Sequence, residues 1–458
     1  MNGTILAIDI GSTKISAVVA QANHGQAKIL GQGVSKSQGI KKGIISNIDL
    51  ASKSIRNAVS DAKKISGTNV SSAIVTISNA YAKSINSNGI VNITNNEITL
   101  KEINRAMQTA LYNAKIPDEY EIIHVLPYNF TVDEQEFIED PFGMNASRLE
   151  VNVNIIMTQK SNLFNLKKAI NSVGIEIESI VLSGYASALA VISDEERAQG
   201  VGVIDIGGQT SDLIIHTGNA IRYTDFLGVG SNHISNDLSM ALHTPVPVAE
   251  NIKLNYIDFT NISNEDIEIP IIGDESNTKS VSLDMVYNVV FARVEETLML
   301  LADSIENSSL ANQMNGGIVI TGGMSKLKGI KELAQSIFTG LSVRIGQPKE
   351  LDNLFDELKD PTYAATVGLI LYKLGYHTPY EINFKQQMLH TKDDYKDNLS
   401  DIKLSSDEEI QIANTNNIEL AQDNTNQNND IRFDELPDLE SDNTNVFKKI
   451  SSWAKGLF

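Results

Sequence analysis

Hydrophobic residues near the start of the chain fall into short apolar runs broken by polar turns. Residues 4–21 hold two such runs around the turn 11–14, which predicts a β-hairpin, and residues 28–35 supply a third strand. Between 49 and 66 the apolar residues instead recur at helical spacing, and 72–78 is again a buried strand. The first unit is therefore predicted to be a sheet covered by a helix.

Residues 83–166 have the pattern of a separate insert. Strands and one helix are expected in it: two strands within 82–93, a helix over 100–114, and strands over 121–130 and 148–158. This content predicts a small α+β module docked on the first unit. A helix over 161–173 and a strand over 175–182 then return the chain to that unit.

The second half of the chain begins with another apolar run and turn at 201–212. The pattern after it predicts the following elements: a strand over 220–227, helices over 229–241 and 245–255, a polar, turn-rich stretch to about 282, a long helix over 286–307, a strand over 316–321 and a helix over 327–337. Small residues cluster in 362–374, which is typical of a closely packed helix.

The composition changes from about residue 385. Residues 391–443 contain fifteen Asp or Glu against four Lys or Arg, with many Asn and Gln. Such a segment buries too little apolar surface to offset the entropy of ordering it. It is predicted to be a disordered acidic tether.

The last thirteen residues, 446–458, are amphipathic. At about 100° per residue, their apolar side chains fall in one sector of about 140°: Val446, Phe447, Ile450, Trp453, Ala454, Leu457 and Phe458. Lys448, Lys449 and Lys455 lie outside it. A helix this short is marginal in water, and lysines with a central Trp suit an anionic bilayer surface. Docking onto the protein's own core, or into a groove of a partner, is the alternative.

Length and composition limit the possible functions. At 458 residues the chain is expected to form at least two domains. A net charge of −20 argues against general nucleic-acid binding. The chain has no cysteine, and its seven histidines lack metal-ligand spacing. No signal peptide and no run of about 20 apolar residues is expected, so the body is predicted to be cytosolic.

One plan occurs twice: a buried strand, an aspartate at its exit, and a glycine turn rich in hydroxyls. It runs from Asp9 to Lys14 and again from Asp205 to Asp212. Glycine permits close backbone approach and successive N–H groups bind anions, so the two turns are predicted to hold a metal–phosphate group between them. Asp9 and Asp205 would face the same cation. Either turn alone could be an ordinary hairpin turn, and Lys14 a solvated loop lysine.

The turn at Thr321-Gly322-Gly323 adds a third part to this nucleotide cradle. Together the three resemble the two phosphate motifs and the adenosine motif of the actin-like ATPase superfamily, and 181–190 and 361–368 resemble its connecting helices. Within that superfamily the chain resembles the FtsA family of bacterial division proteins. The insert with Pro141-Phe142-Gly143-Met144, the acidic linker and the terminal amphipathic helix carry this closer resemblance.

The resemblance implies an α/β, actin-like ATPase fold, with two ribonuclease-H-like domains flanking a nucleotide cleft, an inserted α+β subdomain and a disordered tail. The implied parts are these: a first subdomain of 1–82, 167–199 and 362–384; the insert, 83–166; a second subdomain of 200–235 and 303–361; an outer, FtsZ-binding subdomain, 236–302; the linker, 385–443; and a membrane-targeting helix, 444–458.

The resemblance also implies roles for individual residues. ATP would be contacted by Ser12, Thr13, Lys14, Gly207, Gly208, Gln209, Thr210, Glu250, Lys253, Gly322, Gly323 and Met324. Asp9 and Asp205 would hold Mg²⁺ through waters. Anionic lipid would be contacted by Phe447, Lys448, Lys449, Ile450, Trp453, Leu457 and Phe458. Arg293 is the residue expected to contact FtsZ. Surface ion pairs are the alternative for Glu250 with Lys253 and for Arg293 with Glu296.

One departure from the superfamily concerns catalysis. Related kinases and chaperones place a carboxylate or glutamine in the first connecting helix, whereas Ser183 to Ala190 offers only small residues and a tyrosine. Without a positioned base, hydrolysis is expected to be slow or absent, and no catalytic residue is predicted.

The function implied by the resemblance is that of a peripheral protein on the cytoplasmic face of the inner membrane at the septum. It would self-associate into filaments, tether the C-terminal tail of FtsZ and recruit downstream division proteins. A soluble phosphotransferase or chaperone-like ATPase of the same fold, or a pilus-assembly protein, is the alternative.

Overall fold

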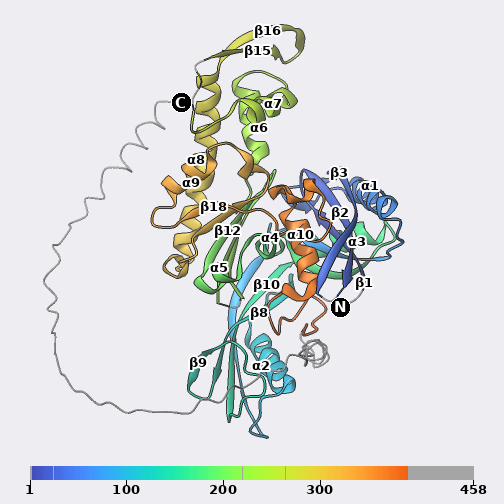
Figure 1. Ribbon diagram of the computed structural model, residues 1–458, viewed down its shortest axis with the longest axis vertical. Coiled ribbons are helices and arrows are strands. Elements are labelled where there is room, and N and C mark those ends of the chain that lie inside the picture. The colour runs from blue at the N-terminus through green and yellow to red at the C-terminus, as the bar shows by residue number, and fades with distance from the viewer. Residues whose placement is uncertain (1–2, 24, 219, 262, 264, 390–458) are drawn as a thin grey trace, which may run out of the picture. The chain divides into compact units, whose positions relative to one another are not determined.

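The structure is a computed structural model that describes residues 3–23, 25–218, 220–261, 263 and 265–389 (Figure 1). Its centre consists of two five-stranded sheets built on one plan. The strand orders are β3-β2-β1-β6-β11 and β14-β13-β12-β17-β18. In each, the first three strands form an antiparallel meander and the last two are parallel to the central strand. The repeat in the sequence therefore reflects a duplicated domain.

The first sheet matches the elements expected near the N-terminus. Its strands are β1 (Gly3–Ile10), β2 (Lys14–Asn23), β3 (Gln26–Lys36), β6 (Ser72–Ile77) and β11 (Glu176–Leu182). Helix α1 (Ile48–Ser66) begins at Asn47, whose side chain accepts a hydrogen bond from Leu50 N. A Cβ on Gly33 would lie 2.1 Å from Ala58 O, so this glycine lets α1 pack closely on β3. Two short strands, β4 (Ile40–Lys41) and β5 (Ile44–Ile45), precede α1.

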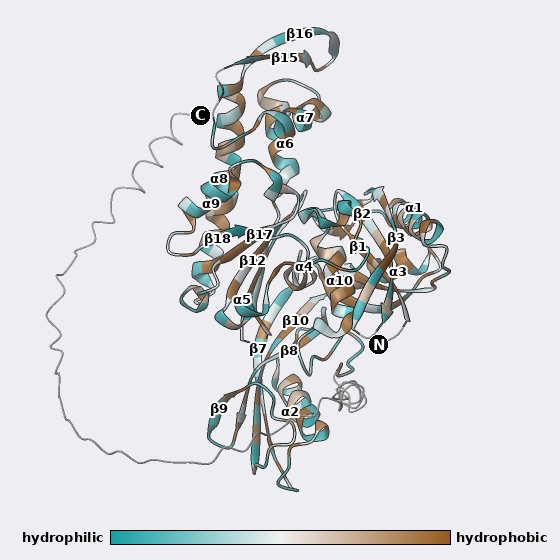
Figure 2. Cartoon of the chain, viewed as in Figure 1, coloured by the Kyte–Doolittle hydropathy of each residue, from teal (hydrophilic) through white to brown (hydrophobic). Residues whose placement is uncertain are grey.

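The second sheet repeats this arrangement later in the chain. Its strands are β12 (Val201–Ile206), β13 (Ser211–Thr217), β14 (Ala220–Leu227), β17 (Ile318–Thr321) and β18 (Val343–Ile345). Helices α5 (Asp194–Gln199), α8 (Leu283–Asn307) and α9 (Ile330–Ile337) belong to this half or border it. The apolar residues concentrate in the strands of both sheets and in α10 (Figure 2).

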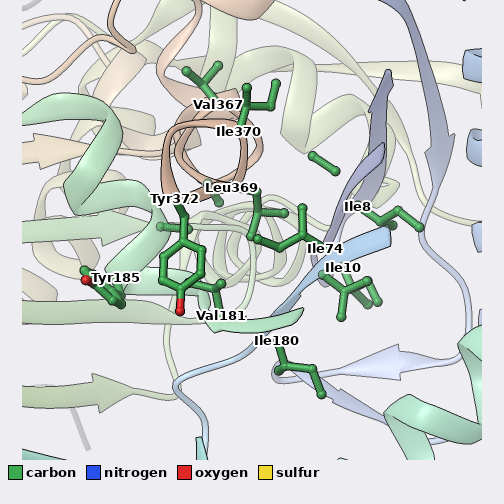
Figure 3. Packing of buried hydrophobic residues seen from close by; sticks show 14 of the residues in the cluster. Ile8, Ile10, Ile74, Ile180, Val181, Tyr185, Val367, Leu369, Ile370 and Tyr372 are labelled. Atoms are coloured by element: carbon green, nitrogen blue, oxygen red, sulfur yellow. The ribbon is translucent and has the colours of Figure 1, made fainter. Parts of the chain in front are cut away.

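Two apolar helices, α4 (Ser183–Val191) and α10 (Ala364–Leu371), pack against each other between the halves. A Cβ on Gly368 would lie 1.7 Å from Ala186 O, so only glycine permits this crossing. Leu369 of α10 points toward Ile74 of β6 in the hydrophobic core (Figure 3). The small residues of 362–374 thus form the closely packed helix expected from the sequence.

The insert forms its own four-stranded sheet of β7 (Lys83–Asn92), β10 (Arg148–Gln159), β8 (Tyr120–Val132) and β9 (Gln135–Ile138), with helix α2 (Leu100–Asn113) on one face. The expectation of two strands within 82–93 was wrong, because β7 pairs with β10 without interruption. Gly89 makes no turn. A Cβ there would lie 2.1 Å from Ala106 O, so the glycine admits α2. Helix α3 (Lys160–Asn171) follows the insert.

The outer part contains α6 (Ser231–Ala241), α7 (Val246–Tyr256) and the start of α8. The polar, turn-rich stretch expected up to about 282 contains a hairpin of β15 (Asp266–Ile271) and β16 (Asp274–Ser282). Few of its side chains are buried; Ile269 and Val281 are the buried apolar ones. Because so few of its side chains are buried, the sequence of this hairpin shows little alternation of apolar and polar residues.

A buried polar network joins the insert to the rest of the body. Glu381 accepts hydrogen bonds from His124 Nδ1 of β8 (2.6 Å), Tyr372 OH (2.7 Å) and Tyr185 OH of α4 (3.1 Å). Leu182 N donates to His124 Nε2 (3.1 Å), which fixes the proton of the neutral ring on Nδ1. The segment carrying Glu381 adds a bridge between Ile382 and Val125 at the edge of the insert. Among the described residues, no helix has both the length and the hydrophobicity needed to cross a membrane.

Candidate functional site

A pocket of about 350 Å³ lies between the two halves, a size within the range of small-molecule sites. All but one of the residues expected to contact nucleotide line it: Ser12, Thr13, Lys14, Gly207, Gly208, Thr210, Glu250, Lys253, Gly322, Gly323 and Met324. Asp9 and Asp205 line it as well. The structure therefore brings together residues that lie more than 300 positions apart in the sequence.

The two loops have the same local structure. In the first, Gly11 N donates to Lys14 O (3.1 Å); in the second, Gly207 N donates to Thr210 O (2.9 Å). Each loop follows the central strand of its sheet and precedes an antiparallel neighbour. Both loops thus present a tight backbone turn to the same pocket, which suits anion binding.

The loops also contact each other's half of the protein. A Cβ on Gly208 would lie 1.8 Å from Thr13 Oγ1, so the two turns touch. Gln209, the expected residue that does not line the pocket, accepts a hydrogen bond from Lys42 N (2.7 Å) through its Oε1. This hydrogen bond joins the two halves, and the expected contact of Gln209 with nucleotide stays a prediction.

Asp9 and Asp205 are both buried carboxylates held by hydroxyl groups. Thr76 Oγ1 donates to Asp9 (2.9 Å) and Ser187 Oγ to Asp205 (2.5 Å). Burial raises the pKa of Asp9 against the opposing effects of Thr76 and Lys14. Burial likewise raises the pKa of Asp205 to about 6. A cation between them would relieve this cost of burying charge.

A third carboxylate, Asp212 on β13, was not assigned a role from the sequence. It is the cross-strand neighbour of Asp205 and lines the pocket. Ser183 Oγ at the start of α4 donates to its Oδ2 (2.8 Å). Burial, and then the charge of Asp205, raise the pKa of Asp212 to about 8. The sequence places Asp212 at the end of the second glycine loop. Whether its side chain faces the pocket, however, depends on the register between β12 and β13, which the sequence does not show.

Lys14 does not extend into solvent. Its Nζ donates to Thr362 Oγ1 (2.9 Å) and lies over the ring of Tyr363. Burial lowers its pKa to about 8, although Asp9, Asp360 and Asp205 oppose the shift. A buried ammonium next to the loops is available to an anionic group in the pocket.

The far wall of the pocket is polar. Lys253 Nζ pairs with Glu250 (2.7 Å) and donates to Ser235 Oγ (3.1 Å), and Lys253 is only 3% exposed. The pair has the helical spacing of a surface salt bridge; the structure buries Lys253 at the pocket, while the Glu250 side chain is 40% exposed. Across from it, Gly322 has φ +83°, and a Cβ there would lie 2.2 Å from Asp205 Oδ1. The glycine therefore brings the third turn against the carboxylate.

Arg293 on α8 lies away from the pocket lining. Its Nε pairs with Asp237 of α6 (2.6 Å) and its second nitrogen with Glu296 (2.5 Å). The ion pair expected as the alternative is therefore present. The residues of 444–458 that were expected to contact lipid, and the linker from 390 onward, lie outside the described residues. Residues 385–389 fold back in a turn, with Leu389 N donating to Glu381 O (2.9 Å).

The residues present fit a magnesium nucleotide. Both glycine turns and the Lys14 side chain line the pocket, and Asp212 Oδ1 is buried without a hydrogen-bond partner among the described residues. Buried carboxylate oxygens are the ligand type of Mg²⁺. In the part of the chain that the structure describes, no three His, Asp or Glu side chains are close enough to hold an ion directly.

Comparison with known proteins shows which family models and relatives this chain resembles. A family model described as "Cell division protein FtsA" matches residues 202–368, and one described as "SHS2 domain inserted in FTSA" matches 79–157. Cell division protein FtsA of Helicobacter pylori (strain ATCC 700392 / 26695) is 39% identical over 424 residues, 85% of this chain and 86% of that protein. FtsA of Pseudomonas aeruginosa is 34% identical over 374 residues, 81% and 89% respectively.

Solved structures confirm the expected fold. The "PilM-PilN type IV pilus biogenesis complex" aligns with a TM-score of 0.59 and 17% identity, over 81% of this chain and 98% of that chain. MreB5 of Spiroplasma citri bound to ADP aligns with a TM-score of 0.50 and 15% identity, over 81% and 96%. At these identities the likeness concerns the actin-like fold alone.

Proposed function

The chain belongs to the FtsA family of cell division proteins, and from this premise we propose that it is an ATP-binding adaptor that tethers FtsZ polymers to the inner membrane at the division septum. The family implies a role in cell division, and its actin-like ATPase fold implies nucleotide binding. The observation that carries the proposal is the pocket closed by two loops from duplicated halves.

ATP occupies this pocket in the proposal. Ser12, Thr13 and Lys14 hold phosphates from one side and Gly207, Gly208 and Thr210 from the other, because both turns line the cavity. Glu250 and Lys253 hold the ribose and base, and Gly322, Gly323 and Met324 close over the adenosine. Asp9 and Asp205 hold Mg²⁺ through waters, which neutralises phosphate charge during binding.

Nucleotide acts mainly as a conformational ligand. Contacts between the halves, such as Gly208 with Thr13 and Gln209 with Lys42, surround the phosphate end of the pocket. A ligand held from both sides favours the closed arrangement of the halves by the difference in its affinity for the two states. The closed form is proposed to be the one that self-associates into filaments.

Partner binding is proposed at the outer part, residues 236–302, which would receive the C-terminal tail of FtsZ. Arg293 is its proposed contact. Because Arg293 already pairs with Asp237 and Glu296, an incoming carboxylate would have to exchange with one of them. The other subdomain boundaries expected from the sequence, and the recruitment of downstream division proteins, belong to the same proposal.

The membrane anchor is proposed to be residues 444–458, lying flat on anionic lipid of the cytoplasmic leaflet. Each large apolar side chain is worth about 1.5 to 3 kcal/mol if fully buried, but partial burial and helix folding reduce the sum. Each lysine adds roughly 1 kcal/mol near anionic lipid. One copy therefore binds weakly, and many copies in a filament bind together through avidity.

Flotation with liposomes containing anionic lipid tests the adaptor. Trp453→Glu places a charge in the apolar sector and should abolish flotation while ATP affinity stays unchanged. Ser452→Glu adds the same charge one residue away, on the polar sector, and should float far better. If Trp453→Glu floats as the parent does, the helix is not the anchor, and a soluble ATPase of the same fold becomes the better description.

A further inference from the structure

Helices α1 and α3 lie side by side on the first half of the protein (Figure 1). Ser52 Oγ of α1 donates to Ala169 O of α3 (3.1 Å), and Arg56 Nη2 donates to Ser172 O at the end of α3 (3.0 Å). Together the two helices contain seven Lys or Arg against two Asp, in a chain with 37 Lys or Arg against 57 Asp or Glu. Their charge is therefore opposite to that of the whole chain.

The exposed sides of the two helices form one surface, because both helices bury their other side in the same hydrophobic core. We call this surface the basic face; it consists of Lys53, Arg56 and Lys64 of α1 and of Lys160, Phe164, Lys167 and Lys168 of α3. None of its cations forms an ion pair with a carboxylate of the described residues. Asp49 and Asp61 of α1 are exposed nearby, but α3 carries no acidic residue. The positive charge of the face is thus left for an external partner.

Phe164 adds an apolar group to the basic face. Its side chain is 64% exposed, whereas Leu163 and Leu166 on the other side of α3 are buried. Lys160 and Lys168 lie four residues before and after Phe164, so the ring and both ammonium groups share one side of the helix. An exposed aromatic ring flanked by lysines suits the boundary between the headgroups and acyl chains of an anionic bilayer. A purely polar partner would leave the ring without a contact.

The described part of the chain ends next to this face. Lys167 Nζ lies 5.5 Å from the ring centre of Phe384, five residues before Leu389. The chain beyond leads to 444–458, the proposed membrane anchor. A flexible linker between a body and its anchor fixes no orientation of the body. Charge complementarity and the place where the chain leaves the body therefore both favour an anionic lipid surface as the partner of the basic face.

We propose that the basic face is a second membrane contact, which binds anionic lipid headgroups and turns α1 and α3 toward the bilayer. This inference rests on the proposed anchoring of the protein by 444–458. The attraction between lysines and a charged surface fades over about 10 Å at moderate salt, so the face acts once the anchor has brought the body close. In a filament every copy presents the same face, and the weak contacts add together.

A tryptophan at position 164 tests the contact directly, because Trp453 is the only tryptophan of the chain. The full-length protein with Trp453→Phe and Phe164→Trp keeps an aromatic residue in the anchor and carries its one indole on the basic face. The probe is a vesicle of phosphatidylglycerol and phosphatidylcholine with brominated acyl chains, which quench indole fluorescence on contact. For vesicle-bound protein we expect the emission to fall about twofold or more.

A matched reporter places the indole elsewhere on the body. Tyr112 on α2 is 90% exposed, and Tyr112→Trp in the same Trp453→Phe background should show no quenching at an equal bound fraction, measured by sedimentation. This comparison separates contact by the basic face from mere closeness of the body to the vesicle.

Charge reversal tests the lysines. Lys160→Glu together with Lys168→Glu should abolish quenching at position 164 and lower the affinity of the full-length protein for phosphatidylglycerol vesicles by about tenfold or more. Lys101→Glu together with Lys331→Glu changes the net charge equally, at two exposed lysines of α2 and α9. This control should keep the quenching and change the affinity less than about threefold.

Four results would overturn the proposal. Vesicle-bound protein without quenching at position 164 would show that the basic face does not touch lipid, although the anchor works. Equal effects of the two charge reversals would mean that only net charge matters. Loss of self-association without vesicles in Lys160→Glu with Lys168→Glu, at unchanged vesicle binding, would make the face an interface between copies. A protein that never sediments with vesicles would remove the adaptor function as well.

Discussion

Gly208 and Thr13 belong to different halves of the protein and touch across the nucleotide pocket. A Cβ on Gly208 would lie 1.8 Å from Thr13 Oγ1, closer than any real contact. Neither residue is near the other in sequence. The closed arrangement of the halves thus depends on the absence of one side chain.

Gly208→Ala should therefore keep the halves apart. The added methyl must displace Thr13, so we expect ATP affinity to fall at least tenfold, about 1.4 kcal/mol, with little change in thermal stability. Calorimetric titration with Mg-ATP measures this. Gly228→Ala is the matched control, because its Cβ would meet only Phe226 at 3.9 Å. Equal ATP affinity for both variants would contradict a contact that matters for binding.

Removal of magnesium should weaken ATP binding through Asp9 and Asp205. In wild type, chelation with EDTA is expected to lower ATP affinity by about tenfold or more, since two buried carboxylates then face the phosphates without a cation. Asp205→Asn should reduce this difference between magnesium and EDTA, and Asp225→Asn should preserve it. An undiminished magnesium effect in Asp205→Asn would place the ion elsewhere.

Stability of the nucleotide-free protein should depend on pH through the pocket carboxylates. Burial raises the pKa of Asp212 to about 8 and that of Asp205 to about 6, from 3.8. At a pH between 3.8 and its raised pKa, each of these carboxyl groups is protonated in the folded protein but ionised in the unfolded chain. The free energy of unfolding should therefore fall as pH rises from about 4 to about 8, by up to about 1.4 kcal/mol per pH unit for each protonated group.

Urea unfolding at several pH values in EDTA measures this slope. In Asp212→Asn, the free energy of unfolding should change little between pH 6 and 8, because Asp205 is already ionised in that range. The other groups that act on Asp212 are Asp205, Ser183 and Asp9. Lys14 lines the same pocket, and its lowered pKa of about 8 makes stability rise only above that pH. An unchanged slope in Asp212→Asn would mean that Asp212 is ionised in the empty pocket.

Glu381→Ala should destabilise the junction between the insert and the body. The buried donors His124 and Tyr372 would lose their acceptor, and Tyr185 OH would keep only its contact with Thr378 Oγ1. We expect a loss of about 3 kcal/mol in unfolding free energy, because each buried unsatisfied group costs about 1–3 kcal/mol. Glu178→Ala removes the partly exposed partner of Lys373 and should cost under about 1 kcal/mol. Similar losses for both variants would contradict the importance of the network.

The sequence predicted the fold well where the signal is local. The strand, aspartate and glycine turn at Asp9 and at Asp205 were visible because apolar runs and glycine act over a few residues. Their convergence on one pocket followed from the duplication. The two strands expected within 82–93 form one strand, and Gly89 in it makes room for a helix packed from elsewhere in the sequence, which local patterns do not reveal.

Other features of the site depend on distant parts of the chain. Asp212 lies in the pocket because β13 pairs with β12 in a register that sets Asp212 opposite Asp205. Its carboxylate is hydrogen-bonded by Ser183, which comes from helix α4. Lys14 was expected near phosphate, but its contacts with Thr362 and Tyr363 could not be foreseen from residues some 350 positions away. Pairing of buried side chains is a tertiary property, so sequence spacing alone does not specify it.

The chain leaves the described body at Leu389, whose backbone N–H is bonded to Glu381 O. Any tensile load arriving from the following residues is thus borne first by the Glu381 segment. From there it passes to His124 in the insert and to Tyr185 in α4, the helix that begins with Ser183 at the nucleotide pocket. Tension on the tail would thus have a hydrogen-bonded route from Leu389 through Glu381 to the helix that borders the nucleotide pocket.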